Sequence, residues 1–178
     1  MKYDLDYYEF LLKKDRVTAE EIAKLRWDFI MDLHPQVILD YGCGISWFRT
    51  YRPKNIIVDS YDIAPFPQTG ILHKEYDIIC FWDVLEHIPD WNDIVELLKT
   101  TKYIAMTIPI KPKEVAWKDW HHLRPLHHLH WFDLELLDAL FDYLGFIKIR
   151  CGQPECPPRK DIYSLIYKRK EMYGKEYS

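Results

Sequence analysis

The segment VILDYGCG, residues 37 to 44, combines an acid with a Gly-x-Gly turn in a pattern typical of nucleotide-type binding loops. Its three leading apolar residues predict a buried parallel strand, which ends at Asp40. Gly42 and Gly44 follow at once. Because glycine has no Cβ, the chain can turn there with positive φ and a ligand can approach the backbone closely. The pattern therefore indicates a ligand site at the carboxyl end of this strand.

A second strand that ends in acids strengthens this interpretation, since a lone Gly-x-Gly is most often an ordinary turn. The run IIVDSYDIAP, residues 56 to 65, is largely apolar and contains Asp59 and Asp62. It lies about twenty residues after the first strand, the spacing expected of a carboxylate that binds ribose. A carboxylate offers two acceptor oxygens and can therefore accept both ribose hydroxyls. Both acids meet this condition.

The segment YDIICFWDVLEHIPD, residues 76 to 90, predicts a third buried strand that runs straight into a helix start. Glu86 and His87 lie at this helix start. In one interpretation Glu86 is an acid favoured by the helix dipole, and His87 is a hydrogen-bonded, partly buried imidazole. In the other, His87 acts on a substrate as a base or an orienting group, because its pKa suits proton transfer near neutral pH.

Five of the eight histidines gather within ten residues, at His121, His122, His127, His128 and His130. A metal site is one explanation, because His128 and His130 would point the same way on a strand. However, no cysteine or acid at metal-ligand spacing joins them, and Cys151 and Cys156 are not spaced like a zinc knuckle. We therefore predict no metal. A structural role, with imidazoles bonding backbone carbonyls of a long loop, is as open as a role in acting on a substrate.

These segments resemble the class I S-adenosylmethionine-dependent methyltransferases, especially the small methyltransferase-domain families. Leu85-Glu86-His87-Ile88-Pro89 matches the Leu-Glu-His-hydrophobic signature that follows their fourth strand. HLHWFD, residues 128 to 133, resembles their His-x-His-x-Phe segment, and Gly145-Phe146 resembles their terminal Gly-Phe. The resemblance extends from Val37 to Lys168 and so covers most of the chain.

The resemblance implies that S-adenosyl-L-methionine is the cofactor. Gly42, Cys43 and Gly44 would back its methionine half, and Asp40 would anchor the loop or the amino end of the cofactor. The fuller family pattern has a third glycine, which Ser46 replaces here. Serine is small, so the motif is softened rather than broken.

Further cofactor contacts follow from the same resemblance. The DIAP sequence resembles the family's acid-hydrophobic-x-Pro, so Asp62 is the preferred ribose ligand. Asp59 is then a solvated or loop-capping acid. Trp82 and Asp83 would face the cofactor, with Trp82 near the methionine chain; alternatively, Trp82 is a packing residue.

The candidate catalytic residues are His87, His128 and His130. The resemblance implies that His128 and His130 belong to a segment that covers the active site after the fifth strand. There, either histidine would orient or deprotonate the methyl acceptor, while neighbouring tryptophans exclude water.

Alternating strands and helices predict an α/β fold with a doubly wound sheet. We expect strands near residues 37–40, 55–61, 77–81, 103–108, 146–150 and 161–170. We expect helices near residues 18–32, 45–50, 90–100 and 133–144, the first opened by a capping box at Thr18 to Glu21.

The resemblance makes this sheet Rossmann-like, of the class I methyltransferase type, with the last strand antiparallel. Residues 63–75 leave room for only an abbreviated middle strand or none. We expect one methyltransferase-like domain over residues 1–178, with a helical N-terminal extension over 1–35 and the core over 36–170.

The composition of the 178-residue chain excludes few functions. A net charge of −4 gives no overall basic field for nucleic acid or an anionic membrane. Four well-spaced cysteines suggest free thiols in a reducing compartment. The N-terminus lacks the apolar stretch of a signal peptide, and no run reaches the length of a membrane span. We expect a soluble cytoplasmic protein that does not bind membranes, and either a monomer or a homodimer.

The expected function is transfer of a methyl group from S-adenosyl-L-methionine to oxygen, nitrogen or carbon of a small molecule. Two alternatives remain: methylation of nucleic acid (a tRNA or DNA base) or protein, and cofactor binding without transfer. A nicotinamide-dependent enzyme is disfavoured because Trp47 stands where the third glycine of Gly-x-Gly-x-x-Gly belongs. Families with the Leu-Glu-His signature methylate quinones, lipids, sugars, antibiotics and tRNA bases, so the resemblance does not identify the acceptor.

Overall fold

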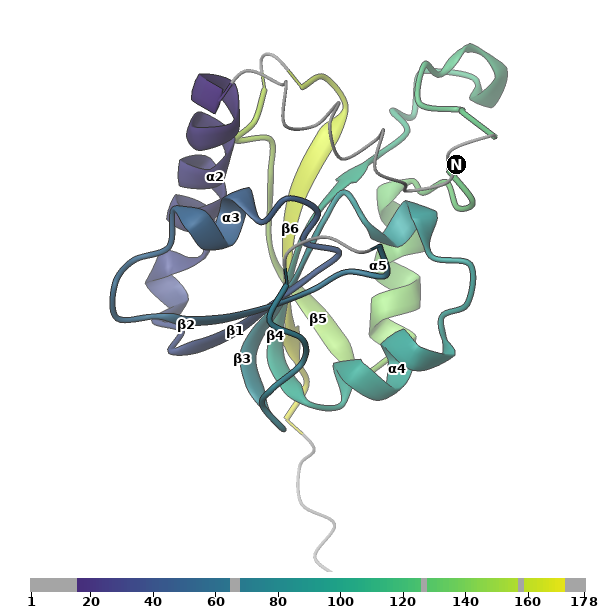
Figure 1. Cartoon of the computed structure of the whole chain (residues 1–178). Coiled ribbons are helices and arrows are strands. Elements are labelled where there is room, and N and C mark those ends of the chain that lie inside the picture. Colours follow the sequence, from purple (N-terminus) through teal and green to yellow (C-terminus); the bar gives the residue numbers. More distant parts are fainter. Residues whose placement is uncertain (1–15, 65–67, 126–127, 157–158, 172–178) are drawn as a thin grey trace, which may run out of the picture.

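A computed structural model describes residues 16–64, 68–125, 128–156 and 159–171 of the chain (Figure 1). Their centre is one six-stranded sheet with the strand order β2-β1-β3-β4-β6-β5. Its strands are β1 (Val37–Tyr41), β2 (Ile57–Tyr61), β3 (Tyr76–Trp82), β4 (Thr101–Pro109), β5 (Phe146–Gly152) and β6 (Ile162–Arg169). The predicted strands are thus all present, with ends displaced by one or two residues.

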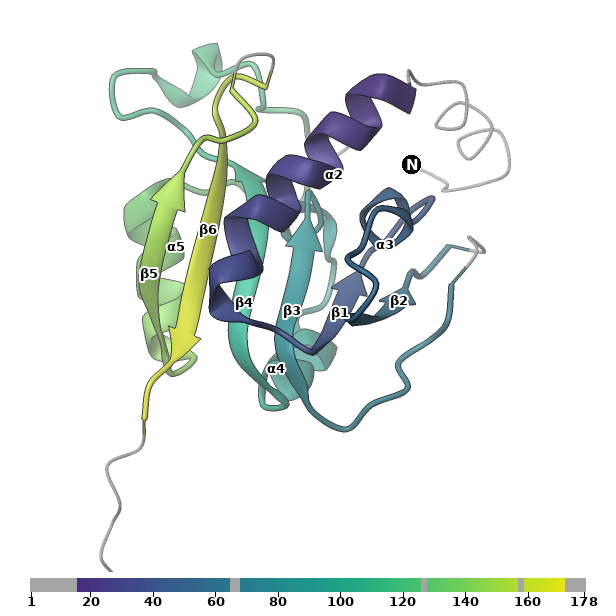
Figure 2. The ribbon, with the colours of Figure 1, turned by 90° about the vertical axis from the view of Figure 1, so that its left-hand side faces the viewer.

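Helices cover both faces of the sheet (Figures 1 and 2). On one face lie α2 (Arg16–Ile30) and α3 (Trp47–Thr50), and Figure 2 shows α2 crossing the sheet. On the other face lie α4 (Asn92–Leu98) and α5 (Leu134–Tyr143). Short 3-10 turns form at η1 (Met31–Leu33), η2 (Leu85–His87) and η3 (Trp117–Asp119). None of the described helices combines the length and apolar character needed to cross a membrane.

The strand directions confirm the predicted doubly wound, Rossmann-like α/β sheet. Strands β2, β1, β3 and β4 run parallel to one another. The last strand, β6, is antiparallel to both of its neighbours, β4 and β5. Between β2 and β3, no strand forms over the described residues 62–64 and 68–75, so β2 is an edge of the sheet.

Two apolar layers sandwich the sheet because successive residues of a strand point to opposite faces. Ile38 and Ile78 pack in the layer with Trp27 of α2. Their neighbours Leu39 and Ile79 pack in the opposite layer, which includes residues of α4 and α5. All four strand residues are fully buried. This two-sided burial explains why the strands appear in the sequence as continuous apolar runs.

The ends of the helices show where local sequence signals suffice. Asp133 caps α5, accepting a hydrogen bond from the backbone N of Leu136 at 2.8 Å, and Gly145 follows the helix with φ +84°, as predicted. The predicted capping box of the first helix is wrong. Helix α2 is already formed at Arg16, so Thr18 lies inside it and cannot be its N-cap.

Candidate functional site

The loop after β1 is fixed against the end of β2. The backbone N–H groups of Gly42 and Cys43 both donate to the carbonyl of Tyr61, at 2.7 and 3.0 Å. Ser46 N–H donates to the Cys43 carbonyl at 2.8 Å and closes the turn. Because parallel strands place their carboxyl ends at one edge, this loop and the end of β2 form one shared surface, where α/β sheets bind ligands.

The two glycines of this loop serve different purposes. Gly42 has φ +73°, and a Cβ there would lie only 2.5 Å from Cγ2 of Val84, in the segment after β3. Gly44 has φ +51°, and a Cβ there would meet nothing within 4 Å. Gly42 therefore allows two loops to pack closely, whereas Gly44 borders open space that a ligand can enter. Ser46, in the third-glycine position, also has a positive φ of 60°.

Asp59 caps the loop that leads to β3. Its buried Oδ2 accepts hydrogen bonds from the backbone N of Leu72 at 2.9 Å, from His73 Nδ1 at 2.8 Å and from the Tyr76 hydroxyl at 2.8 Å. Burial raises the pKa of this carboxyl, but the bonds from His73 and Tyr76 outweigh it and lower the pKa overall. Its acceptor capacity is largely used within the protein.

Asp62 joins the ends of the first two strands. Its Oδ2 accepts from the backbone N of Gly44 and its Oδ1 accepts from the backbone N of Ala64, both at 2.8 Å. The side chain lies at the rim and is only partly buried. Each carboxylate oxygen has a second lone pair, so Asp62 can still accept the hydroxyls of a ribose beside Gly44.

Asp40 is buried, and its Oδ2 has no hydrogen-bond partner among the described residues. Burial raises the pKa of this carboxyl to about 7; Asp62 adds to the rise and Arg26 opposes it. The nearby Cys43 thiol is also partly buried, which raises its pKa to about 12. An unpartnered buried carboxyl next to the open side of Gly44 suits a ligand that brings positive charge. S-adenosyl-L-methionine, with its amino and sulfonium groups, fits this requirement.

Trp82 ends β3 and packs in the α2 layer of the core. Its ring lies 5.3 Å from that of Phe48, and the Arg26 guanidinium lies over it at 5.1 Å. Trp82 therefore packs in the core, as in the alternative interpretation of this residue from the sequence. Its indole Nε1, however, is a hydrogen-bond donor that is buried without a partner among the described residues.

Asp83 lies in a ring of four charges that the sequence did not reveal. Its carboxylate pairs with Arg26 of α2 at 2.8 Å and with Arg159 at 2.7 Å. Both arginines also pair with the buried Glu155, Arg26 through its Nε at 2.8 Å. Burial raises the pKa of Asp83, but the charges of Arg159 and Arg26 outweigh this and lower it to about 2.

This charge ring ties α2 and the β5–β6 loop to the end of β3. Asp83 also has a positive φ of 61°, a rare conformation outside glycine that often occurs at functional sites. No local signal in the sequence could have found the ring, because Arg26 and Glu155 are 129 residues apart. The Asp83 side chain is thus directed to the arginines, whereas the side chain of the next residue, Val84, lies against Gly42 of the predicted cofactor loop.

Glu86, in η2, is buried three residues further on, and its Oε2 has no partner among the described residues. Burial raises the pKa of this carboxyl to about 8, and the charge of Asp83 acts in the same direction. The Glu86 carbonyl accepts hydrogen bonds from the backbone N of Leu129 at 2.7 Å and of His130 at 3.1 Å. These bonds hold the histidine-rich loop against η2.

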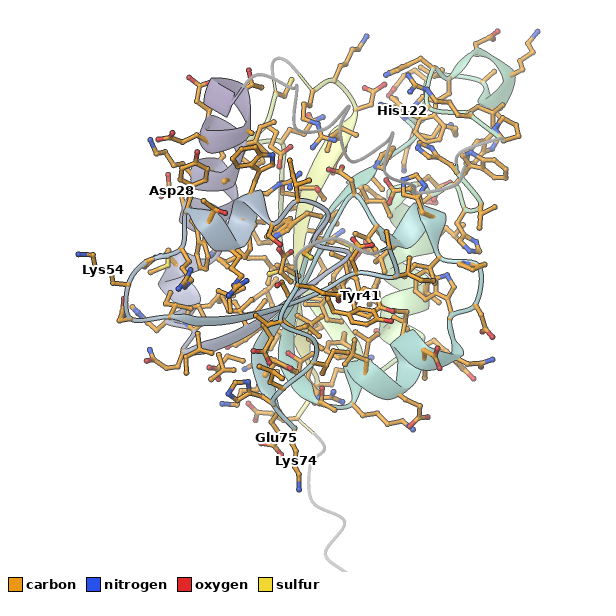
Figure 3. All side chains as sticks on the ribbon, viewed as in Figure 1. Asp28, Tyr41, Lys54, Lys74, Glu75 and His122 are labelled. Atoms are coloured by element: carbon orange, nitrogen blue, oxygen red, sulfur yellow. The ribbon has the colours of Figure 1, made fainter. Side chains whose placement is uncertain are left out.

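Two of the three predicted catalytic histidines meet beside this acid. His87 Nε2 is 3.9 Å from Glu86 Oε1, and the rings of His87 and His128 lie edge to face with centroids 5.0 Å apart. His128 Nδ1 donates to the His122 carbonyl at 3.0 Å. Burial, aided by His87, lowers the pKa of His128 to about 4. Figure 3 labels His122, which lies in the segment between β4 and α5 that carries this loop, apart from Tyr41 at the end of β1.

His130 points elsewhere. Its Nε2 donates to the Ile88 carbonyl at 2.7 Å, and its ring lies edge-on to Trp91. This contact agrees with the structural role considered for the histidine cluster, in which an imidazole bonds a backbone carbonyl of the loop. His127, the remaining residue of the histidine cluster, lies outside the described residues.

Several solved methyltransferase structures share the fold. A SAM-dependent methyltransferase from Archaeoglobus fulgidus is 18% identical, with a TM-score of 0.59 over 84% of this chain and 94% of that one. The 1,6-didemethyltoxoflavin-N1-methyltransferase of Burkholderia thailandensis, with S-adenosylhomocysteine bound, is 14% identical, with a TM-score of 0.62 over 86% and 79%. Magnesium protoporphyrin IX methyltransferase from Synechocystis PCC 6803, with SAH bound, is 15% identical, with a TM-score of 0.57 over 90% and 88%.

The sequence itself identifies the family. No curated protein matches the chain. A family model described as a methyltransferase domain, however, matches residues 9–149, most of the chain. The chain therefore belongs to the methyltransferase domain family, and it has the Rossmann-like fold of the class I S-adenosylmethionine-dependent methyltransferases.

Proposed function

We propose that this methyltransferase acts on a small molecule, transferring a methyl group to an oxygen, nitrogen or carbon atom. The chain is a transferase with S-adenosyl-L-methionine as its cofactor, which when bound supplies a methyl carbon on a positively charged sulfur. The observation that carries the choice of acceptor is the loop over η2. The backbone N–H groups of residues 129 and 130 donate to the Glu86 carbonyl, and beside this contact a buried acid and two imidazoles have atoms within 4.8 Å of one another. Such groups can orient or deprotonate a single acceptor atom.

The cofactor side of the site would consist of the β1 loop and the end of β2. Gly44 leaves its backbone open to the ligand, Asp62 would accept the ribose hydroxyls, and Asp40 would receive the positively charged amino end. Trp82 and Asp83 would close this side from the end of β3.

The acceptor side would consist of η2 and the loop before α5. His87 and His128 would orient or deprotonate the acceptor atom, and His130 would position the loop by its bond to Ile88. The structural neighbours with named acceptors include a 1,6-didemethyltoxoflavin-N1-methyltransferase with 1,6-didemethyltoxoflavin bound and a magnesium protoporphyrin IX methyltransferase. Both acceptors are small molecules, in agreement with the acceptor class proposed here.

Location and assembly complete the proposed function. The four cysteines lie as free thiols, two of them exposed. We propose a cytoplasmic enzyme that acts without a membrane or nucleic-acid partner. A monomer and a homodimer both agree with the site, since every assigned residue comes from one chain.

Asp59 in β2 and Asp62, directly after β2, provide a matched test. Replacing Asp62 by Asn should weaken the binding of S-adenosylhomocysteine by about tenfold or more, because hydrogen bonds to a charged group are worth roughly 1.5–3 kcal/mol. Replacing Asp59 by Asn should leave this affinity nearly unchanged but lower the melting temperature, because Asp59 caps a loop. Calorimetric titration and thermal unfolding of both variants measure the two effects. Wild-type affinity in the Asp62 variant would refute the proposed cofactor site.

The acceptor class needs its own experiment. Radiolabelled methyl transfer from S-adenosyl-L-methionine into a lysate, separated into small-molecule, nucleic-acid and protein fractions, should label the small molecules. Label that enters RNA, DNA or protein instead would replace the proposed acceptor class. Cofactor binding without label in any fraction would indicate a binding protein.

A further inference from the structure

Within the described parts of the chain, one group of three side chains has the composition and geometry of a metal site. Glu86, His87 and His128 each offer one ligand atom, and these atoms lie within 4.8 Å of one another. The sequence predicted no metal because no cysteine or acid at metal-ligand spacing joins the histidine cluster. The fold supplies that acid from η2, far upstream, by bonding the histidine loop onto it.

Glu86 is the ligand whose surroundings require an explanation. Its Oε2 is buried without a hydrogen-bond partner among the described residues, and a buried polar atom in that state is costly. The nearest arginines, Arg26 and Arg159, pair with Asp83 and Glu155 instead. A bound cation would supply the missing positive partner.

His128 is held in the state that a metal ligand needs. A carbonyl oxygen can only accept, so the 3.0 Å contact with the His122 carbonyl requires the proton on Nδ1 of His128. The Nε2 atom then carries the lone pair. Metal-binding histidines commonly donate their other ring nitrogen to a carbonyl or a carboxylate in this way. His130 uses its own Nε2 for the Ile88 carbonyl and does not belong to the group.

We propose that Glu86, His87 and His128 bind a divalent transition-metal cation of the Zn²⁺ type through one carboxylate and two imidazoles. Imidazole ligands favour zinc, iron, copper or nickel over magnesium and calcium, which prefer oxygen. Three protein ligands leave at least one position of a tetrahedral ion open. An oxygen or nitrogen atom of the acceptor would occupy it, so that His87 and His128 would orient the acceptor through the ion and would not deprotonate it themselves. This role rests on the proposed function, whereas the metal site does not.

The test uses the metal-stripped full chain titrated with Zn²⁺, by calorimetry or by competition with a chromogenic chelator. Wild type should bind one equivalent, and excess Mg²⁺ should not compete. Glu86→Gln keeps the shape of the side chain and removes its charge. It and His128→Gln should each lose more than the roughly 10- to 100-fold in affinity that removal of an outer ligand partner costs. Thermal unfolding without metal shows whether each variant is folded.

His121→Ala is the matched control. His121 lies in the same segment between β4 and α5, and its Nδ1 is 3.5 Å from Oδ2 of Asp161. Its side chain is half exposed, and it does not belong to the group of three. Its Zn²⁺ affinity should equal that of wild type. The proposed site is overturned if folded Glu86→Gln binds Zn²⁺ as tightly as wild type, or if His121→Ala loses affinity to the same degree.

A separate titration with S-adenosylhomocysteine distinguishes failure of the metal site from failure of the proposed function. Zn²⁺ binding that depends on Glu86, without any cofactor binding, would support the metal site and refute the function. Cofactor binding by a chain that does not bind Zn²⁺ would refute the metal site and leave the proposed function supported. Cobalt substitution adds a direct readout, since nitrogen ligands shift the visible absorption of Co²⁺, and this spectrum should be lost in His128→Gln.

Discussion

Asp83 and Glu86 lie three residues apart after the same strand, yet the pKa values of their carboxyl groups are shifted in opposite directions. The charges of Arg159 and Arg26 lower the pKa of Asp83 to about 2, against the effect of burial. Burial raises the pKa of Glu86 to about 8. The difference is the partner. Two arginines reach Asp83, whereas no lysine or arginine among the described residues pairs with Glu86.

Asp40 belongs with Glu86 in this comparison. It lies at the end of β1, is buried, and has an oxygen without a partner among the described residues. Of these three acids at the carboxyl edge of the sheet, Asp83 has its charge compensated within the chain, whereas Asp40 and Glu86 do not. We infer that the two uncompensated acids mark places where positive charge arrives from outside, with the cofactor at Asp40 and with a cation at Glu86.

The comparison also explains a division between stability and function. Closed ion-pair networks hold elements together, here α2, the end of β3 and the β5–β6 loop. Buried acids without partners make the free protein less stable, and such groups persist at sites where a ligand completes them. The largest effects should therefore come from removing charges in the ring, and the most informative ones from removing Asp40.

Replacing Arg26 by Met would remove one of the two arginines that compensate Asp83 and Glu155, so that Asp83 would become more like Glu86. Removing one partner of a buried ion pair costs roughly 3–5 kcal/mol, so we expect a loss of that order in the free energy of unfolding. Methionine retains an apolar side chain over Trp82. Urea unfolding at neutral pH measures the effect.

The same variant has a predicted pH dependence. The pKa of Asp83 is lowered from 3.8 to about 2, so its stabilising contribution is present above about pH 4 and disappears as the pH falls toward 2. The difference between wild type and Arg26→Met should therefore shrink in acid. Lys24→Met on the same helix is the control: Lys24 pairs with Glu20 on the exposed surface, and its loss should not measurably change stability. Equal losses in the two variants would contradict the importance of the ring.

Replacing Asp40 by Asn should change the pH dependence of stability. The folded-state pKa is raised from 3.8 to about 7, so the folded protein holds a proton that the unfolded chain loses. Titration of Asp40 should lower wild-type stability as the pH rises from about 4 to 7, by up to about 1.4 kcal/mol per pH unit. Glu86, whose pKa is also raised by burial, adds a fall of the same sign that continues to about pH 8. Asp40→Asn should lose the Asp40 part of this slope and keep the Glu86 part, become more stable than wild type above pH 7, and bind S-adenosylhomocysteine more weakly.

The groups around Asp40 define the control. Arg26 of α2 and Asp62 after β2 affect its pKa, and the thiols of Cys43 and Cys80 face it from the neighbouring segments. Asp28 lies exposed on α2 (Figure 3), so Asp28→Asn should keep the wild-type slope. Thermal unfolding between pH 4.5 and 8.5, in steps of about half a unit, separates the variants. An unchanged slope in Asp40→Asn would assign the pH dependence to another group.

The sequence predicted the parts of this molecule that depend on short stretches of chain. The strand at residues 37–40 is a run of apolar residues, and burial on both faces of a parallel sheet produces such runs. The turn after it was predictable because Gly42 and Gly44 permit positive φ locally. The proximity of Asp62 to this turn followed from the rule that parallel strands end at one edge.

The sequence could not predict contacts between distant side chains. Arg26 meets Glu155 across 129 residues, and neither residue stands in a motif. Glu86 was recognised as an acid at a helix start, but the two imidazoles beside it became visible only when the loop before α5 was placed on η2. Periodicity shows which side of an element is buried, whereas the pairing of polar groups depends on how elements meet.

The smallest predicted effect on the free energy of unfolding is that of Thr107→Val, which tests whether charge or hydrogen bonding matters more in the charge ring. Thr107 of β4 accepts a 3.4 Å bond from Arg26 through its buried hydroxyl. Thr107→Val preserves the side-chain shape, so we expect a loss of only about 0.5–1 kcal/mol. In the Arg26→Met background the same change should be neutral or stabilising, because the hydroxyl has already lost that partner. A double-mutant cycle by urea unfolding tests this; a Thr107 effect as large as that of Arg26 would mean that hydrogen-bond geometry, not charge, separates Asp83 from Glu86.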